Sequence, residues 1–478
     1  MQDKPTGELM KKSIICAAAF GGLLAFVFAA AGFYKKIPQA EITEKVSGLE
    51  EWEKPDLEYL EYYGVGAFDT TLPVLFIDTK EQRITKDMPI EASVAVLENE
   101  TGMKRSVLDT PNREYVMTIK HRGASSYSQF DKKQYRIKFY EEEGSEKDMG
   151  VSFLGMGKHS EWVLNGPFLD KTLMRNRMVY EVGKMLFEWA PDSRYVEVFV
   201  DGKYQGVYLA VEPVTNGESR LRLSKFGLLS GETSYLVKRD RIGTEQNPLF
   251  VYGKTEGKTN NDLFVSYPVS SRLTKAQKKW ITADISAFEK ALYGEDFADP
   301  HTGYGNYIDI DNFVDYFIFN EAVMNYDAGN LSTYAYKELG GKLQLAIWDY
   351  NNCYDNYQEG SQIYEEIFML DNSWFSRLLQ DRGFVKRVVE RYFQLRKSIL
   401  AEENFYELLE KNEKLLGDAI ERNFAVWGYT FDVNLLSGDG ERDLKSYEQA
   451  VRQLTEAIHK RLTALDEQMP KLYQNCIN

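Results

Sequence analysis

The spacing of apolar residues changes midway along the chain, and this change limits the folds that the sequence can adopt. Up to about residue 212 apolar and polar residues alternate, as in strands, whereas from about residue 274 apolar residues recur at helical spacing. The predicted strands cover 72–78, 91–98, 114–121, 134–140, 195–200, 205–212 and 234–238, with one helix at 171–188. The later predicted helices cover 274–293, 310–325, 372–381, 384–399, 402–424 and 444–469. We therefore expect an α+β fold with a β-rich N-terminal half and a helical C-terminal half.

Two of these elements carry local signals of where they begin or turn. Asp201-Gly202 separates the strands predicted at 195–200 and 205–212, and Asp-Gly is among the strongest short-range signals of a β-hairpin. Asp170 precedes the helix predicted at 171–188, and its carboxylate can accept the free N–H groups of a first helical turn. The sequence thus predicts a hairpin at 201–202 and an N-cap at Asp170.

Charge and composition exclude two classes of function. The net charge of −15 argues against a nucleic-acid partner, because phosphate backbones bind to concentrated basic surfaces. The four histidines show no paired metal-binding spacing, so a zinc hydrolase is not expected. The three cysteines cannot build a disulfide framework. At 478 residues and 43% hydrophobic content, the chain has enough apolar material for a packed core without one.

The N-terminal segment predicts a membrane location. Residues 13–33 carry no charge and lie between Lys11-Lys12 and Lys35-Lys36; at about 1.5 Å per residue they could span a bilayer. We expect a single-pass transmembrane anchor at 13–33 behind a short tail at 1–12, with the large domain outside the cytoplasm. A cleaved signal sequence, which would give a secreted protein, is the alternative. The acidic, weakly patterned residues 34–68 are predicted to form a stalk.

Acidic and amide side chains gather where two predicted elements end. Asp327 follows the helix predicted at 310–325, and Asp349 follows a strand-like run at 342–348. Burying such groups is costly unless they hold a cation or position a substrate. Together they indicate a Mg²⁺ site for phosphate chemistry. In the alternative, structural interpretation Asp327 caps a turn and Asp349 ends a strand.

Several short motifs follow one another along the chain. In order they are Arg122-Gly-Ala-Ser-Ser126, Lys132-Lys-Gln-Tyr-Arg-Ile-Lys138, Trp162-Val-Leu-Asn-Gly-Pro-Phe-Leu-Asp170 with Arg175-Asn176, the hairpin at 195–212, and Trp348-Asp349. This succession resembles the CotH kinase family, from about residue 72 to about residue 430. The family is regarded as an atypical, secretory-pathway type of protein kinase. The resemblance therefore implies a much altered, two-lobed kinase-like fold, with a core at 69–370 and a helical part at 371–478 packed on it.

The resemblance also implies roles for the acidic and amide residues. Asp349 would take the place of the metal-binding Asp of the kinase Asp-Phe-Gly motif, and Asp327 that of the catalytic-loop Asp, as base or metal ligand. Asn330 would be a nearby amide ligand of Mg²⁺ or Mn²⁺. The spacing departs from that of ordinary kinases, whose loop Asn lies five residues after the Asp, because Ser occupies position 332 here. Asn325 is the substitute candidate.

Basic residues for the ATP phosphates are less well marked. Lys138 ends a predicted strand and is the first candidate, with Lys133 as the alternative; either could instead be a solvated edge lysine. Three further candidates line the nucleotide site that the resemblance implies: Glu181 as a partner of that lysine, Arg175 as a second phosphate ligand, and Glu212 near a hinge. Glu181 could also be an ordinary exposed helix residue. Common nucleotide motifs are absent, since Gly155-Met-Gly157-Lys158 lacks the third glycine of a Gly-rich loop and the Ser/Thr of a P-loop.

Three functions remain open at this point. The first is a membrane-anchored kinase that transfers the ATP γ-phosphate to Ser or Thr of exported or spore-coat proteins. The second is a non-catalytic spore-coat or cell-envelope assembly scaffold that keeps the fold. The third, a glycan-active enzyme, would need two carboxylates flanking a sugar groove, and the sequence singles out no such pair. Retention of Asp327 and Asp349 favours the first.

Overall fold

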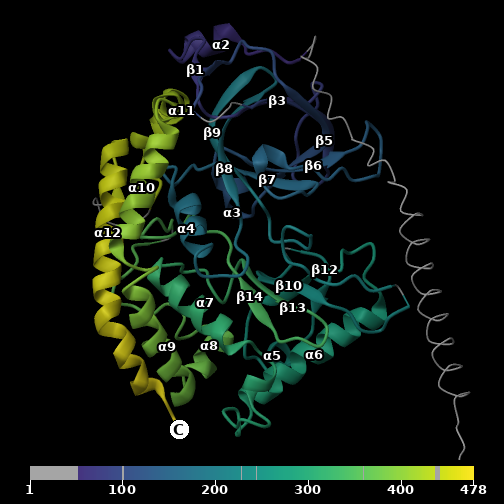
Figure 1. Ribbon diagram of the computed structural model, residues 1–478, viewed down its shortest axis with the longest axis vertical. Coiled ribbons are helices and arrows are strands. Elements are labelled where there is room, and N and C mark those ends of the chain that lie inside the picture. Colours follow the sequence, from purple (N-terminus) through teal and green to yellow (C-terminus); the bar gives the residue numbers. More distant parts are fainter. Residues whose placement is uncertain (1–51, 99–101, 228, 244, 359, 437–441) are drawn as a thin grey trace, which may run out of the picture. The chain divides into compact units, whose positions relative to one another are not determined.

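A computed structural model describes residues 52–98, 102–227, 229–243, 245–358, 360–436 and 442–478 (Figure 1). The described residues all belong to one compact unit by their contacts. The predicted tail at 1–12 and the predicted anchor at 13–33 lie outside the described residues. Within the described part of the chain, no helix combines the length and the apolar character that crossing a membrane requires.

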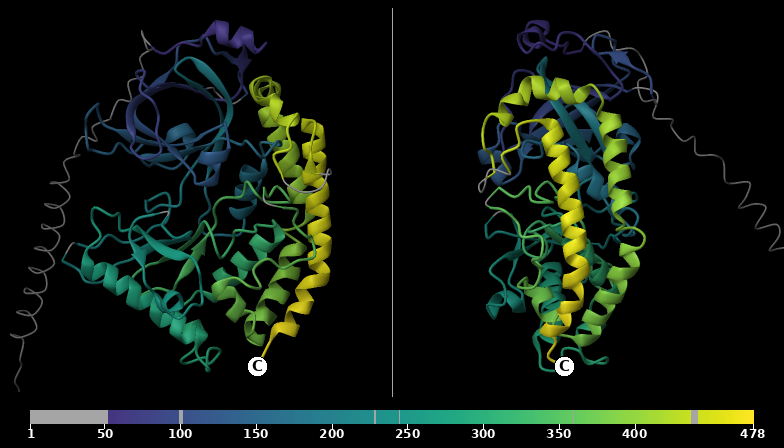
Figure 2. Two further views of the ribbon diagram at one scale, coloured as in Figure 1. Left: turned by 180° about the vertical axis from the view of Figure 1, so that it is seen from behind. Right: turned by 90° about the vertical axis from the view of Figure 1, so that its left-hand side faces the viewer.

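A closed barrel of seven strands forms the first half of the compact unit. Its strands, in order around the barrel, are β2 (Val74–Asp78), β3 (Ile90–Leu97), β5 (Arg113–Arg122), β6 (Gln134–Tyr140), β7 (Glu161–Asn165), β9 (Lys203–Val211) and β8 (Ser193–Val200). Neighbouring strands are antiparallel except β2 and β8, whose parallel pairing closes the ring seen in the left view of Figure 2. Alternate side chains of β5 are buried, as a strand with one face on a core requires.

The barrel confirms most of the strands predicted for the N-terminal half. The predicted hairpin is also confirmed: β8 and β9 pair on either side of Asp201 and Gly202, both of which have positive φ. The helix α4 (Arg175–Gly183) is shorter than the predicted 171–188. Asp170 does not cap it; its carboxylate accepts from the N–H groups of Thr172 (3.1 Å) and Arg175 (2.8 Å) and so closes a turn ahead of the helix.

Part of the predicted acidic stalk is folded against the barrel. Within it α2 (Leu57–Tyr62) forms with Asp56 as its N-cap. Leu60 is fully buried, and the ring of Trp52 lies 4.4 Å from that of Phe76 on β2. The described part of the segment, residues 52–68, therefore differs from the predicted stalk, because its apolar residues pack on the outer face of the barrel. The short strands β1 (Asp69–Thr70) and β4 (Arg105–Ser106) pair beside it.

A second, five-stranded antiparallel sheet follows the barrel. Its order is β11 (Pro248–Leu249), β12 (Asp262–Tyr267), β10 (Tyr235–Asp240), β13 (Thr333–Lys337) and β14 (Gln344–Ala346). The helices of this part are α5 (Tyr252–Thr255), α6 (Lys275–Tyr293) and α7 (Ile310–Ala322); α3 (Ser125–Gln129) belongs to the barrel. Within this region the sequence predicted only the strands near β10 and β14, since the others are short and lie among polar loops.

The remaining helices confirm the predicted helical C-terminal half. They are α8 (Ser373–Leu378), α9 (Arg382–Arg396), α10 (Glu402–Leu416), α11 (Ala419–Trp427) and α12 (Tyr447–Gln468), with 3-10 helices at Phe153–Gly155, Tyr304–Asn306, Gly428–Phe431 and Met469–Asn475. The single helix predicted at 402–424 is two helices, because Gly417 adopts a φ of +47° and ends α10. The helices α9, α10 and α12 share one apolar core with α4 and α7. The mixed α+β class is thus confirmed.

Candidate functional site

The β13–β14 hairpin brings Asp327 and Asp349 to the same end of the second sheet. Asp327 lies in the loop that enters β13, and Asp349 lies just after β14. Because Tyr334 pairs with Ala346 in this antiparallel hairpin, the residues before β13 lie opposite those after β14. The hydroxyl of Ser332 donates to Asp349 Oδ2 at 3.2 Å across this gap. The hairpin therefore explains how two carboxylates far apart in the sequence become neighbours.

The backbone around these carboxylates is strained. Met324, Ser332 and Asp349 have φ values of 55°, 47° and 68°, in the left-handed region that side chains other than glycine rarely adopt. The Asp349 N–H donates to the hydroxyl of buried Tyr180 on α4, at 3.3 Å. Such conformations persist only where the surroundings hold them, and they gather at functional sites. The local geometry thus marks this end of the hairpin as more than an ordinary turn.

The electrostatics of the pair favour a cation. Burial, and next the charge of Asp349, raise the pKa of Asp327 to about 6, although Arg241 and a 3.4 Å hydrogen bond from Asn352 Nδ2 act in the opposite direction. A positive ion between the two carboxylates would relieve this repulsion. Among the described residues no cluster of three or more His, Cys, Asp or Glu side chains could hold a metal by itself. Mg²⁺ commonly binds through one or two carboxylates and completes its shell with water and phosphate, so this pair fits Mg²⁺ or Mn²⁺.

The amide residues near the pair differ from the prediction in their contacts. Asn330 Nδ2 donates to Asn372 Oδ1, and its carbonyl accepts from Asn261 Nδ2 at 3.0 Å. Asn325, the substitute candidate, is buried and donates to Asn320 Oδ1 at 2.9 Å. The amide whose side chain contacts Asp327 is Asn352. Sequence reasoning missed Asn352, because a polar side chain in a loop gives no signal of what it contacts.

The two lysines predicted to meet phosphate have partners elsewhere. Lys138 Nζ forms an ion pair with Asp148 at 2.7 Å, at the surface of the barrel. Lys133 Nζ donates to the carbonyl groups of Tyr127 (2.7 Å) and Phe130 (2.6 Å), and so holds the end of α3. In the part of the chain that the structure describes, both lysines are thus engaged away from the carboxylate pair.

Glu181 on α4 does not pair with either of those lysines. Its carboxylate accepts from Lys411 Nζ at 2.9 Å and from Asn412 Nδ2 at 2.8 Å, both on α10, and it lies 3.5 Å from the guanidinium of Arg177. The lysine–glutamate pair that the resemblance implied is therefore not formed in this structure. The observed contacts give Glu181 a role in joining α4 to α10.

Arg175 is a fully buried anchor behind the site. Its guanidinium pairs with Asp170 at 2.6 Å, donates to the Cys353 carbonyl at 3.0 Å and donates to Gln453 Oε1 at 2.7 Å. Because Cys353 lies four residues after Asp349, Arg175 fixes the loop that follows the carboxylate pair to α4 and α12. These contacts support the site from behind and leave little of the guanidinium for a ligand.

Glu212, predicted near a hinge, lies directly after β9. It is buried and accepts from the Asp192 N–H at 3.1 Å. Burial raises its pKa, and nearby Arg220 lowers it in part. Glu212 thus contacts the turn at Asp192. Among the predicted site residues, the structure brings Asp327 and Asp349 together.

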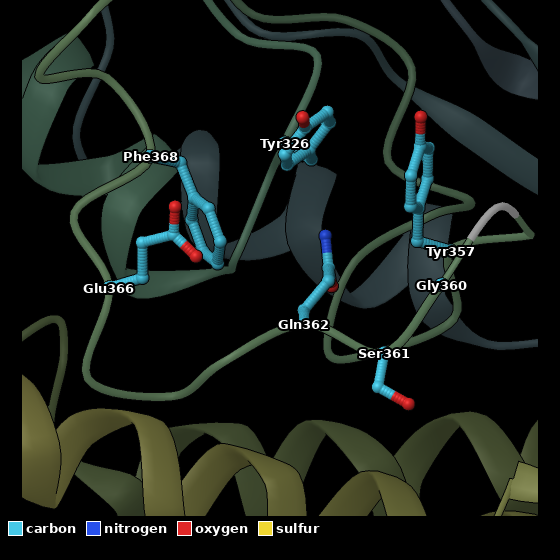
Figure 3. A pocket seen from close by; sticks show the side chains of 7 residues that line it. All are labelled: Tyr326, Tyr357, Gly360, Ser361, Gln362, Glu366 and Phe368. Atoms are coloured by element: carbon cyan, nitrogen blue, oxygen red, sulfur yellow. The ribbon is translucent and has the colours of Figure 1, made fainter. Parts of the chain in front are cut away.

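Two hollows flank the loop that carries Asp327. The larger, of about 290 Å³, is lined by Tyr326, Tyr357, Gly360, Ser361, Gln362, Glu366 and Phe368 (Figure 3). Tyr326 immediately precedes Asp327, is 46% exposed and lies 4.8 Å from the ring of Tyr357. The smaller hollow, of about 190 Å³, is polar and includes Asn330 and Asn261 in its lining. The loop that carries Asp327 thus contributes lining residues to both hollows.

Comparison with known proteins agrees with the motif succession. Residues 119–465, more than half of the chain, match the family described as CotH kinase protein. A curated relative, the inner spore coat protein H of Bacillus subtilis (strain 168), is 24% identical over 332 residues, which cover 67% of this chain and 80% of the relative. Both candidate carboxylates fall within the matched family region.

Proposed function

Because the chain belongs to the CotH kinase protein family, we propose that it is an atypical protein kinase. It would transfer the γ-phosphate of ATP to Ser or Thr residues of exported or spore-coat proteins. The observation that carries this proposal is the meeting of Asp327 and Asp349 at the end of the β13–β14 hairpin, on strained backbone and with like charges that repel each other. Phosphoryl transfer depends mainly on such charge placement and on orientation, with little covalent help from the protein.

The two carboxylates divide the work in this proposal. Asp349, held by Ser332 and by the hydroxyl of Tyr180, would be a metal ligand, with Asp327 and an amide beside it. When bound, Mg²⁺ or Mn²⁺ would supply positive charge for the β- and γ-phosphate oxygens. Asp327 would accept the proton of the acceptor hydroxyl, the role of the catalytic-loop Asp in kinases.

The arrangement of the elements supports a two-lobed, kinase-like fold as part of this proposal. The β-barrel would serve as the N-terminal lobe, and the second sheet with its helices as the C-terminal lobe. Kinases likewise set a catalytic Asp and a metal-binding Asp in separate loops of the second lobe. In this chain the two strands of the β13–β14 hairpin lie between Asp327 and Asp349 in the sequence, so that the two carboxylates belong to different loops.

A coat or envelope location is proposed from the relative and from the sequence. The curated relative is named as an inner spore coat protein, so a coat or envelope protein is the natural acceptor class. We retain as a proposal that residues 13–33 anchor the protein in the membrane, on the warrant of their uncharged length.

A non-catalytic assembly scaffold is the second candidate function. The observation that favours it is the engagement of Glu181 by Lys411 and Asn412, in place of the lysine pairing that the resemblance implied. A scaffold would keep the fold without needing that pair.

Autophosphorylation separates the two candidates. Purified protein is incubated with γ-labelled ATP and either Mg²⁺ or Mn²⁺, and label on the protein is followed over time. The kinase proposal expects metal-dependent labelling that is lost in Asp349→Asn. Absence of labelling on the protein and on added coat-protein extracts, together with no detectable ATP binding, would leave the scaffold as the better account.

A further inference from the structure

A line of hydrogen-bonded amide side chains runs from the barrel to the loop that carries Asp349. Arg122 Nη1 at the end of β5 donates to Gln134 Oε1 at 2.7 Å, and Asn165 Nδ2 donates to the same oxygen at 3.3 Å. Asn176 Nδ2 donates to Asn165 Oδ1 at 3.3 Å, and the Tyr350 N–H donates to Asn176 Oδ1 at 2.8 Å. The three amide residues are each less than 9% exposed. The barrel and the site loop are thus joined by polar contacts in a buried region.

The far side of Tyr350 continues the line toward Asp327. The Tyr350 hydroxyl donates to Asn320 Oδ1 at 3.2 Å, and Asn325 Nδ2 donates to the same oxygen at 2.9 Å. Asn325 lies two residues before Asp327. Buried polar groups are costly unless satisfied, and a connected set of them fixes one arrangement. The same line of contacts therefore reaches both carboxylate loops.

Arg122 lies at the barrel end of this line, close to Trp348. Its guanidinium is 5.5 Å from the ring of Trp348, the residue before Asp349. Its charge acts on Tyr180, whose hydroxyl receives the Asp349 N–H, and on Tyr334 of β13. Within the described part of the chain, Gln134 is the one hydrogen-bond partner of this guanidinium. Donors remain on it for a ligand.

The other basic groups considered for phosphate are committed elsewhere. Lys138 pairs with Asp148, and Lys133 donates to carbonyl groups near α3. The guanidinium of Arg175 binds Asp170 and the Cys353 carbonyl. A guanidinium suits phosphate better than an ammonium because its planar fork can make two parallel hydrogen bonds. Arg122 is the barrel cation that combines available donors with proximity to Asp349.

We propose that Arg122 binds the polyphosphate of the nucleotide opposite Asp349, and that Gln134, Asn165 and Asn176 are positioning residues that fix it there. This inference rests on the proposed kinase function and adds the barrel's contribution to it. The cation supplied by Arg122 and the metal held by the carboxylates would face the triphosphate from opposite sides. The line of amide side chains would hold Arg122 in a fixed position relative to the loop that carries Asp349.

Binding of ATP compared with adenosine tests the role of Arg122. Calorimetry with Mg²⁺ should show ATP affinity falling about 10- to 100-fold in Arg122→Gln, the scale of one charge-assisted hydrogen bond, while adenosine affinity stays unchanged. Arg122→Lys should recover part of the loss. Arg136→Gln is the matched control, because Arg136 is an arginine of the adjoining strand that pairs with Glu161 at the surface, and it should bind ATP as the parent does. Melting temperatures confirm that each variant is folded.

A double-mutant cycle tests the positioning role. Gln134→Met should weaken ATP binding several-fold, and adding it to Arg122→Gln should cause little further loss, because Gln134 affects the polyphosphate mainly through the arginine that it contacts. Additive losses, or equal losses for ATP and adenosine, would overturn the positioning role.

The outcomes separate this inference from the function beneath it. A parent protein that does not bind ATP with Mg²⁺ would overturn both the kinase proposal and the role of Arg122. A different result would overturn the inference alone. In that case the parent binds ATP, Arg122→Gln keeps the parent's ATP affinity, and Lys138→Gln or Lys133→Gln loses affinity.

Discussion

Asp349 occupies a backbone conformation that few residues tolerate, and this fact shapes how it can be tested. Its φ of +68° lies in the left-handed region, where Asn and Asp are several-fold enriched over other non-glycine residues. The sequence identified both carboxylates because each follows a predicted element. The sequence did not identify the hydroxyl of Ser332 or the amide of Asn352, which contact them, because a polar residue in a loop gives no signal of what it contacts.

The Asp349→Asn substitution separates catalysis from stability. Asn keeps the shape and tolerates the same φ, so the melting temperature should remain close to that of the parent, while loss of the charge should reduce phosphoryl transfer by about 10²-fold or more. Both quantities are measured on one preparation. A structural role for Asp349 predicts the reverse pattern, a lower melting temperature with activity that follows the folded fraction.

Lys132 is a buried cation away from the carboxylate pair, and its burial has a consequence for stability. Its ammonium donates at 2.7 Å to both the Val207 carbonyl and Asn423 Oδ1, and burial lowers its pKa well below the usual value. The unfolded chain, with a lysine pKa of about 10.4, then binds the proton more tightly than the folded chain. Lys132 therefore destabilises the fold at neutral pH, and this effect fades as the pH rises toward the unfolded pKa.

The Lys132→Met variant makes this dependence measurable. The melting temperature of the variant minus that of the parent should fall between about pH 7 and about pH 9.5, since only the parent gains stability from deprotonation of the lysine. The hydrogen bonds lost in the variant add a nearly constant offset. A difference that stays constant across this range would contradict a depressed pKa for Lys132.

At the scale of elements, helix α11 joins the C-terminal part of the chain to the barrel. Arg422 makes two 2.9 Å contacts with the fully buried carboxylate of Glu197 on β8, and Trp427 Nε1 donates to the Gln205 carbonyl at 2.9 Å. The sequence predicted one helix at 402–424, and it predicted neither the break at Gly417 that separates α10 from α11 nor the contact of α11 with the barrel. Helical spacing reports which face of a helix is apolar, and it does not report which element covers that face.

Breaking the Arg422–Glu197 pair should cost much of the stability. Arg422→Met leaves the Glu197 carboxylate buried with only Tyr204 as a hydrogen-bond donor among the described residues, and such a loss costs about 3–5 kcal/mol. Urea denaturation measures the change. Lys104→Met is the control at the start of the same helix, because Lys104 and Asp418 form an exposed pair and should contribute at most about 1 kcal/mol. Equal effects of the two variants would remove the proposed role of the buried pair.

For the whole molecule, the sequence predicted the class of fold more fully than its topology. The alternation of apolar and polar residues predicted most of the barrel strands, and Asp201-Gly202 predicted one hairpin. The parallel pairing of β2 with β8 that closes the barrel joins segments more than a hundred residues apart, and no local pattern reports such a pairing. The predicted pairing of Lys138 with Glu181 is not formed for the same reason. Lys138 pairs with Asp148 and Glu181 pairs with Lys411, and these residues become neighbours only in the folded chain.

The central claim is that Asp327 and Asp349 form a metal-dependent nucleotide site, and calorimetry of ATP binding tests it most directly. Two carboxylates repel a triphosphate unless a divalent cation lies between them, so ATP should bind to the parent protein in Mg²⁺ and fail to bind in excess chelator. Binding in Mg²⁺ should weaken when Asp349 is replaced by Asn. Equal ATP affinity with and without the metal would contradict the account.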